Sequence, residues 1–190
     1  MIAYPFCKIN IGLFITSKRS DGFHNIATCF YPIKTLSDIL EIVPASTFSF
    51  QQTGINIDGN SQDNLVVKAY KLLQKYHNCP MVNVHLHKCI PIGAGLGGGS
   101  SDAISTLLLL NEMFQLAISK QELEQYANDL GSDCAFFLQN SPAIGKERGN
   151  VLTPINLNHL AGLHLVLIKP NIHINTILNM EFSNLSKDTI

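Results

Sequence analysis

The amino-acid sequence predicts a mixed α/β fold, of the α+β kind, and three observations favour it. Stretches of alternating or β-branched apolar residues fill the first third of the chain. Apolar residues at helical spacing follow, and a further strand-like stretch then lies between two helical regions. The chain has 190 residues, which is enough for one domain with a sizeable core, or for one domain and part of another.

Four strands are predicted in the first third of the chain. Branched and aromatic residues fit the pleated surface of a sheet, and the polar or proline-containing stretches between them indicate turns. The expected strands cover residues 9–16, 27–33, 38–44 and 47–52, and the expected turns cover 17–23, 34–37 and 44–46.

The middle of the chain predicts a helix that starts at residue 65, followed by a strand over 82–88. The helix is indicated by apolar side chains at helical spacing as far as residue 76. Asp63 or Asn64 is placed to cap it, since short polar side chains accept hydrogen bonds from the first free N–H groups of a helix.

Two more helices and two shorter elements are predicted after that strand. Residues 103–116 are apolar enough for a buried helix, and Ser119 begins a capping box for a helix over 119–130. Residues 131–139 predict a turn into a short apolar element, and 163–170 predict a late strand that Pro170 stops.

Composition narrows the possible partners. The net charge is −1 with histidines counted as neutral, so the sequence predicts no nucleic-acid partner and no membrane surface. No apolar run reaches the ~18 residues of a membrane span, and the start of the chain lacks an apolar leader. The five scattered cysteines are expected to be reduced thiols in the cytoplasm. His85 and His87 alternate on a strand without a third ligand, so we expect no metal site formed by protein side chains.

Residues 91–103 read PIGAGLGGGSSDA and contain five glycines in seven positions. Glycines 93, 95 and 98 match a dinucleotide-binding GxGxxG pattern, but that unit needs a parallel strand after its helix, and here a second helix follows. A Walker A loop needs a lysine that this stretch lacks. A hinge or a tight packing turn is a third reading, but it rarely needs so many glycines before two hydroxyls and a helix.

The remaining interpretation is an anion-binding loop. Successive backbone N–H groups that glycines leave accessible form a cradle for oxyanions, and a helix N-terminus adds partial positive charge. A triphosphate fits such a cradle. Ser100 and Ser101 are placed to donate to phosphate oxygens or to ligate a magnesium ion.

This glycine loop resembles the phosphate loop of the GHMP kinases, which phosphorylate small molecules. Two further stretches agree in type and order: residues 7–33, CKINIGLFITSKRSDGFHNIATCFYPI, and residues 131–138, GSDCAFFL. The resemblance implies a GHMP kinase N-terminal domain of the ribosomal protein S5 domain 2-like fold over residues 1–162. It also implies a left-handed crossover, against the usual right-handed rule, and only the beginning of a C-terminal domain at residues 163–190.

The resemblance implies two catalytic residues. Asp133 matches the aspartate that accepts a proton from the substrate hydroxyl, and Lys8 matches a lysine that lies near it. Taken without the resemblance, Asp133 is equally well read as a helix cap, and Lys8 as part of a solvated strand face. Phosphoryl transfer depends mostly on positioning and electrostatics, which such a pair supplies.

The branch of the family that the motifs match best phosphorylates the 2-hydroxyl of a cytidine-diphosphate-linked methylerythritol, for isoprenoid synthesis. Asn10, Phe23 and His24 match positions that bind this small molecule. The sequence has DGFH where the family usually has DGYH, so ring stacking is kept and a hydroxyl contact is lost. Cys7 replaces a usual alanine, which we read as a packing difference.

The resemblance also implies ATP and Mg2+ as cofactors. Asn64 and Lys88 match positions near the adenine and the phosphates, although Asn64 is also read as a helix cap and Lys88 as a solvated strand end. The predicted nucleotide-binding residues of the loop itself are Pro91, Gly93, Gly95, Leu96, Gly97, Gly98, Gly99, Ser100 and Ser101.

Two alternatives stay open. One is another GHMP kinase with a different small-molecule substrate. The other is a nucleotide-binding module without turnover, because the family's enzymes carry a second glycine-rich segment late in the chain, whereas the last glycine here is Gly162.

Overall fold

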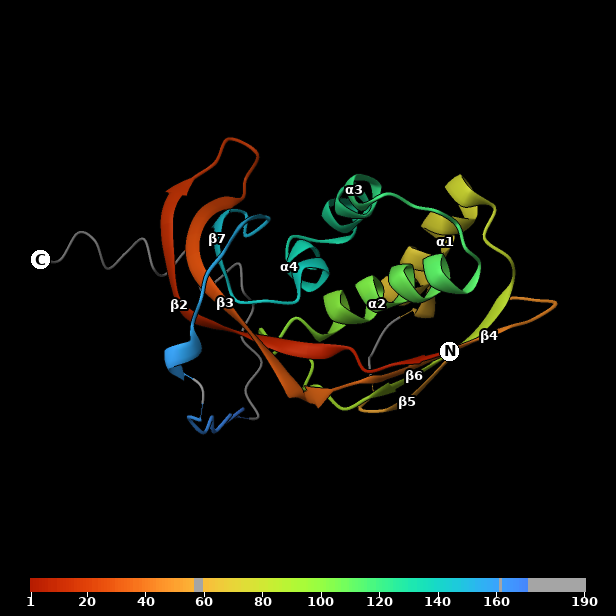
Figure 1. The fold of residues 1–190 in the computed structure, drawn as a ribbon, viewed down its shortest axis with the longest axis horizontal. Helices are drawn as coiled ribbons and strands as arrows, with labels where there is room; N and C mark the ends of the chain where they lie inside the picture. Colours follow the sequence, from red (N-terminus) through yellow and green to blue (C-terminus); the bar gives the residue numbers. More distant parts are fainter. Residues whose placement is uncertain (57–59, 161, 171–190) are drawn as a thin grey trace, which may run out of the picture.

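The computed structural model describes residues 1–56, 60–160 and 162–170. Two four-stranded sheets, with strand orders β1-β4-β6-β5 and β2-β3-β7-β8, form the framework. In Figure 1 the helices lie over one face of the first sheet, and the second sheet rises beside them as a long bent hairpin. The predicted mixed fold is therefore confirmed.

The bent sheet is built on the antiparallel pair β2 (Phe6–Lys18) and β3 (His24–Ser37). β7 (Ala143–Glu147) pairs with β3, and β8 (Val151–Pro154) pairs with β7; neither strand was predicted. The turn expected at 34–37 is wrong, because β3 continues through this polar stretch. Its end still has a strand partner, since Ser37 lies opposite Phe6.

The other sheet has one buried face. β1 (Ile2–Ala3), β4 (Ile39–Pro44) and β6 (Val82–Lys88) are joined by antiparallel pairing, and β5 (Ser49–Gly54) runs parallel to β6. Alternate side chains of β4 and β6 point into the core, which is the period-2 pattern of a sheet covered on one side. A 3-10 turn (Ser61–Asp63) and a helix connect β5 to β6, and the handedness of this crossover stays a prediction.

In the described part of the chain four α-helices pack against one another: α1 (Leu65–His77), α2 (Gly98–Met113), α3 (Lys120–Leu130) and α4 (Cys134–Gln139). Of these, α2 contacts β1 and β4 of that sheet. α2 begins at Gly98, not at residue 103 as expected, so the last glycines of the loop form its first turn. The capping box at α3 is confirmed: the Ser119 hydroxyl accepts from the Glu122 N–H, and the Glu122 carboxylate accepts from the Ser119 N–H.

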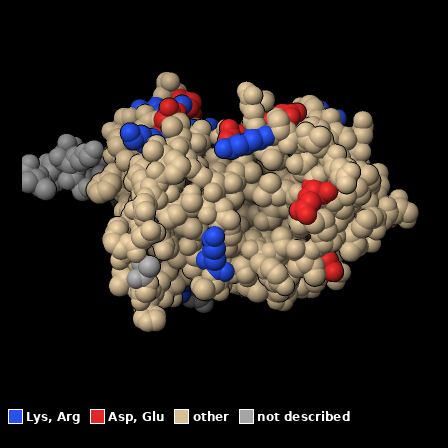
Figure 2. All heavy atoms as spheres, viewed as in Figure 1, with Lys and Arg blue, Asp and Glu red and all other residues tan. Residues whose placement is uncertain are grey.

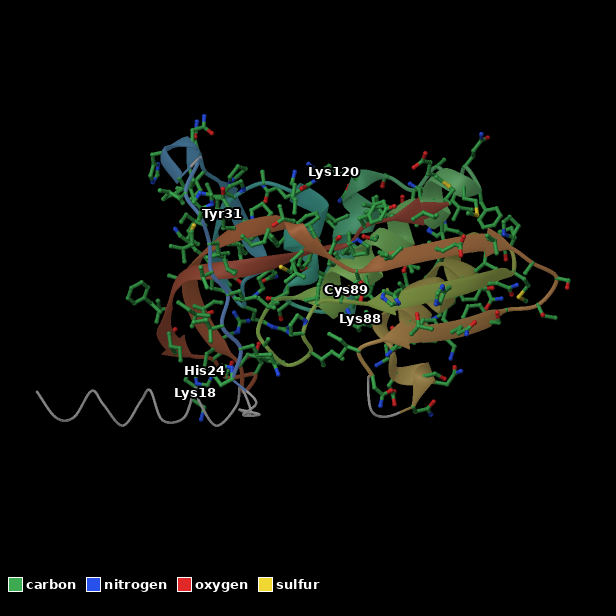
Figure 3. The ribbon with its side chains drawn as sticks, turned by 90° about the horizontal axis from the view of Figure 1, so that it is seen from below. Lys18, His24, Tyr31, Lys88, Cys89 and Lys120 are labelled. Atoms are coloured by element: carbon green, nitrogen blue, oxygen red, sulfur yellow. The ribbon has the colours of Figure 1, made fainter. Side chains whose placement is uncertain are left out.

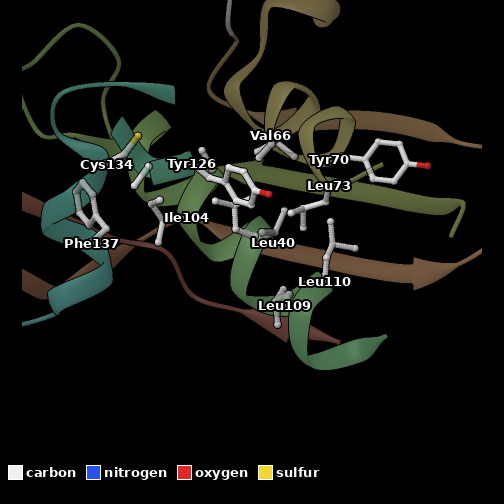
Figure 4. Packing of buried hydrophobic residues seen from close by; sticks show 14 of the residues in the cluster. Leu40, Val66, Tyr70, Leu73, Ile104, Leu109, Leu110, Tyr126, Cys134 and Phe137 are labelled. Atoms are coloured by element: carbon white, nitrogen blue, oxygen red, sulfur yellow. The ribbon is translucent and has the colours of Figure 1, made fainter. Parts of the chain in front are cut away.

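The core lies between the sheet and the helices. Figure 4 shows Leu40 of β4 facing Leu73 of α1 and Ile104 and Leu110 of α2, and all four are fully buried or nearly so. A smaller cluster of Cys7, Ile90 and Leu96 lies beneath the glycine loop. This second cluster attaches the loop to the start of β2.

The strand expected at 163–170 is wrong, because these residues have no regular structure. Extended chain becomes a strand only when a neighbouring strand accepts its hydrogen bonds, and within the described residues none pairs with it. Most of its large apolar side chains are exposed, among them Leu163, Val166 and Ile168. A 3-10 turn (Asn158–Leu160) precedes it. The domain boundary expected at residue 163 stays a prediction, and residues 171–190 lie outside the described residues.

Charged side chains of both signs are scattered over the face seen in Figure 2, without a continuous basic area. All five cysteines are free thiols. Within the part of the chain that the structure describes, no helix has the length and apolar character needed to cross a membrane. In the same residues no group of three or more His, Cys, Asp and Glu is arranged to hold a metal ion.

The capping box of α3 is expected to contribute to the stability of the fold. Ser119→Ala should lower the free energy of unfolding by about 1 kcal/mol, because the first turn of α3 loses its acceptor. Lys120→Ala is the matched control, since the neighbouring Lys120 side chain is 90% exposed and its pair with Glu124 is 3.8 Å long. We expect a change within about 0.5 kcal/mol there. Urea denaturation measures both, and equal losses would contradict the role of the cap.

Candidate active site

The glycine loop encloses a cavity of about 350 Å³. Its walls come from the end of β6, the loop, the first turns of α2 and the start of α1. The lining residues that the sequence predicted are Asn64, Lys88, Pro91, Gly93, Gly95, Leu96, Gly97, Gly98, Gly99 and Ser100. The cavity size is typical of a small-ligand site. The N-terminus of α2 lies in its wall, so backbone N–H groups and the helix dipole are available to an anion.

Gly97 is the position where the loop most needs glycine. Its φ of +69° lies in the left-handed region, and it forms the N-cap of α2. A Cβ atom on Gly97 would lie 2.8 Å from the Phe137 ring and 3.1 Å from Cγ of Lys8. The loop backbone therefore passes in direct contact with the Lys8 side chain.

Lys8 and Asp133 form an ion pair beside the loop. Lys8 Nζ lies 3.2 Å from Asp133 Oδ2, and the side chains are 5% and 36% exposed. Lys8 belongs to β2, whereas Asp133 precedes α4 without making a side-chain capping bond. Asp133 occupies the N-cap position of α4, but its side chain does not act as a cap. The solvated reading of Lys8 is wrong, because Lys8 is buried. The partly exposed carboxylate has an oxygen available to a ligand.

A chain of hydrogen bonds holds the Lys8 ammonium in place. Lys8 Nζ donates to Asn10 Oδ1 at 2.7 Å, and Asn10 Nδ2 donates to Thr28 Oγ1 at 2.8 Å. The Thr28 hydroxyl in turn donates to the Gly12 carbonyl at 2.6 Å. Asn10 is therefore bound within the protein next to Lys8, and Thr28 on β3 is a supporting residue that the sequence did not indicate.

The main chain of Lys8 joins the pair to the loop. The Lys8 N–H donates to the Leu96 carbonyl at 2.9 Å. This residue thus contacts the loop through its backbone and the aspartate through its side chain. The two parts of the predicted site are adjacent.

Phe23 and His24 lie at the other end of the β2–β3 hairpin. Figure 3 shows His24 close to Lys18, its partner across the hairpin. Phe23 is 50% exposed, and the Arg148 guanidinium carbon lies 3.9 Å from its ring centroid. Arg148 also donates to the Ser132 hydroxyl at 3.2 Å, so it connects this hairpin to the residue before Asp133. The sequence did not single out Arg148.

The two serines of the loop have different environments. Ser100 lines the cavity, whereas Ser101 is 1% exposed and lies outside the cavity wall. Of the two serines, Ser100 is therefore the one that a ligand in the cavity could contact. Asn64 caps α1, as the sequence predicted, and its side chain accepts from the Val66 N–H at 2.9 Å.

Lys88 is 3% exposed, so its reading as a solvated strand end is wrong. Its ammonium lies 2.7 Å from Asp102 Oδ2 and also contacts Asp38 Oδ2. Burial alone would lower the pKa of Lys88, but the two carboxylates raise it. Burial raises the pKa of Asp102 to about 7, against the opposing effect of the Lys88 charge. Asp102 stands in the quoted loop motif, but its charge role was not predicted, and Asp38 was not predicted at all.

Residues 64–141 match the family model described as GHMP kinases N terminal domain. The matched residues run from the N-cap of α1 past the end of α4, so this part of the chain is a GHMP kinase N-terminal domain. It is 53% identical over 176 residues to a 4-diphosphocytidyl-2-C-methyl-D-erythritol kinase of Azobacteroides pseudotrichonymphae, covering 93% of this chain and 65% of that relative. It is 52% identical over 181 residues to the kinase of the same name from Bacteroides thetaiotaomicron, with the same coverage. The chain therefore spans just under two thirds of the length of these relatives.

Solved structures agree with the fold. A crystal structure of 4-(cytidine 5'-diphospho)-2C-methyl-D-erythritol kinase matches with a TM-score of 0.71 and 33% identity, covering 83% of this chain and 56% of that one. The Methanococcus jannaschii mevalonate kinase matches with a TM-score of 0.57 and 13% identity, covering 82% and 56%. This second likeness concerns the fold alone.

The close approach at Gly97 generates a prediction for ATP binding. Gly97→Ala should weaken it at least tenfold, because the new Cβ displaces the loop from Phe137 and Lys8. Gly95→Ala is the matched control, since Gly95 has a similar φ of +70° but open space where its Cβ would lie. Calorimetric titration with ATP measures both. Equal losses would mean that backbone strain, and not the close approach, governs the loop.

The raised pKa of Asp102 generates a pH prediction. Between about pH 4 and pH 7 the folded protein keeps a proton that the unfolded chain, with a pKa of 3.8, releases. The free energy of unfolding contributed by Asp102 therefore falls as pH rises through this window, by up to about 1.4 kcal/mol per unit. Asp102→Asn should remove that contribution. Chemical denaturation at several pH values tests this, and parallel profiles for parent and variant would contradict it.

Proposed function

We propose that this chain carries the ATP-dependent phosphorylation of the 2-hydroxyl of 4-diphosphocytidyl-2-C-methyl-D-erythritol. The observation that supports it best is the Lys8–Asp133 pair in contact with Gly97 of the glycine loop. A phosphoryl acceptor must meet a base and a phosphate at one point, and this arrangement places the proposed base beside the proposed phosphate loop. The names of the relatives supply the substrate.

Asp133 is the proposed base. Its carboxylate is partly exposed and makes no capping bond, so a substrate hydroxyl can approach it and donate its proton. The Lys8 ammonium stabilises the negative charge of the carboxylate and, as the proton leaves, the charge that develops on the substrate oxygen. Asn10 and Thr28 keep Lys8 oriented for both contacts.

The loop and the N-terminus of α2 are proposed to bind the ATP phosphates. Backbone N–H groups around Gly97 and Gly98 offer hydrogen bonds to phosphate oxygens, and the Ser100 hydroxyl offers one more. Mg2+ fits this site as a hard cation that takes oxygen ligands, mainly from phosphates and water, with Ser100 as the nearby protein oxygen. Bound there, it would neutralise charge on the phosphates.

Phe23 and His24 are proposed to bind the cytidine end of the substrate. An exposed aromatic ring offers a stacking surface for a base, and the adjacent Arg148 offers positive charge to a diphosphate. Arg148 Nε is buried without a partner among the described residues, so the charge of the guanidinium, and not this N–H, is what a diphosphate would meet. A cytoplasmic location is proposed with this function.

Two other functions remain as outcomes of the same test. Another GHMP kinase activity would use the same Lys8–Asp133 pair with a different small alcohol, such as mevalonate or homoserine. A nucleotide-binding module would bind ATP without turnover.

The test is ADP formation by the purified chain with Mg2+ and ATP, in the presence of each of these three alcohols. We expect turnover with the cytidylated substrate, and Asp133→Asn should lower kcat by at least about 10²-fold while the ATP dissociation constant changes less than twofold. Equal turnover of mevalonate or homoserine would refute the proposed substrate. Bound ATP without any turnover would identify a nucleotide-binding module.

A further inference from the structure

A buried charge cluster lies where the glycine loop joins β6 and α2, and two of its three residues, Lys88 and Asp102, also line the cavity. Asp38, Lys88 and Asp102 come from three elements: the β3–β4 junction, the last residue of β6 and the second turn of α2. Their side chains are between 0% and 2% exposed. Figure 3 shows Lys88 and Cys89 together where β6 ends and the loop begins.

Asp38 is the centre of this cluster. Its Oδ1 accepts from the backbone N–H groups of Cys89, at 2.6 Å, and Ile90, at 2.8 Å, and its Oδ2 accepts from the Lys88 ammonium. The same Lys88 ammonium also donates a hydrogen bond to Asp102 Oδ2 at 2.7 Å. The Asp38 side chain therefore binds the backbone of the two residues that precede the loop.

The consequence is that both ends of the loop are fixed to one carboxylate. The first end is held directly, at Cys89 and Ile90. The second end is held through Lys88 and Asp102, which lies four residues after Gly98 in α2. A loop whose two ends are fixed to one point keeps its N–H groups aimed in one direction, and such pre-organisation is what anion binding requires.

Asp38 also reaches the strand that carries Lys8. Its backbone N–H donates to the Pro5 carbonyl at 2.9 Å, three residues before Lys8. The same buried residue thus restrains the loop and the start of β2. Burying two carboxylates with one ammonium is costly, and a fold gains little stability from such a cluster compared with apolar packing. Its position between the two parts of the site points to a role other than stability.

We infer that Asp38 is a positioning residue for the nucleotide phosphates, acting through Lys88 and Asp102 on both ends of the glycine loop. This inference rests on the proposed function, since it requires the loop to bind a nucleoside triphosphate. Asp38 is fully buried and lies outside the cavity wall, so it would act without direct contact to the nucleotide. The effect of Asp38 is on the geometry of the glycine loop.

A positioning role for Asp38 and simple electrostatics predict opposite changes in ATP affinity when Asp38 loses its charge. Asp38→Asn removes a negative charge behind a site for a polyanion, so electrostatics alone would make ATP bind more tightly. If Asp38 positions the loop, ATP should bind at least about tenfold more weakly, because the ammonium of Lys88 is released from one of its two anchors. Adenosine, which has no phosphates, should bind to parent and variant within about twofold.

The experiment is calorimetric titration of the whole chain with ATP and with adenosine, together with a thermal melt. Ile42→Ala is the matched control, since Ile42 is fully buried in β4, four residues after Asp38, and outside the loop cavity. This control should lower the melting temperature and leave ATP affinity within twofold. Asp102→Asn is the second variant, in case Asp38→Asn does not fold. It releases only the second end of the loop and should weaken ATP binding about threefold or more.

Tighter or unchanged ATP binding in Asp38→Asn would overturn the inference, as would an equal loss for adenosine. The inference would also be overturned if, in all three variants, the loss of ATP affinity were proportional to the fall in melting temperature. If Asp38→Asn does not fold, tighter or unchanged ATP binding in Asp102→Asn would overturn it. A parent chain that binds no ATP would instead refute the proposed function, so the two failures are distinguishable.

Discussion

The contact between Lys8 and the glycine loop determines the arrangement of the candidate site. The backbone of Lys8 bonds to Leu96, its side-chain stem lies against Gly97, and its ammonium meets Asp133. The loop, the hairpin β2–β3 and the start of α4 therefore meet at one residue. A lysine this deeply buried is stable only because Asp133 and Asn10 satisfy its charge and its donors.

Local patterns predicted much of this arrangement. Alternation predicted β2, β3, β4, β5 and β6. The ends of β6 were correct and those of β4 nearly so, whereas the ends of β2, β3 and β5 differed by two to four residues. Ser119 and Asn64 were correctly predicted as helix caps, because a cap bonds to backbone groups only a few residues away. The motifs also predicted Lys8 and Asp133 as neighbours, although 125 positions separate them, since a family resemblance carries spatial information that periodicity does not.

The features that were missed depend on contacts distant in sequence. Asp38 bonds to Lys88 across 50 positions, and nothing near Asp38 in the sequence indicates a buried partner. The start of α2 was placed too late because glycine is a poor helix former, and only the packing around Gly97 fixes that turn. The strand expected at 163–170 has the right residues, but a strand also needs a neighbour to pair with.

The stack of Arg148 on Phe23 has a consequence for how a base can approach. An aromatic ring has two faces, and the guanidinium covers one of them at 3.9 Å. A planar ligand is left with the opposite face alone, so it must enter this end of the hairpin from a single side. Arg148, held between the Phe23 ring and the Ser132 hydroxyl, would thus impose a direction on the proposed cytidine base before any hydrogen bond to it forms.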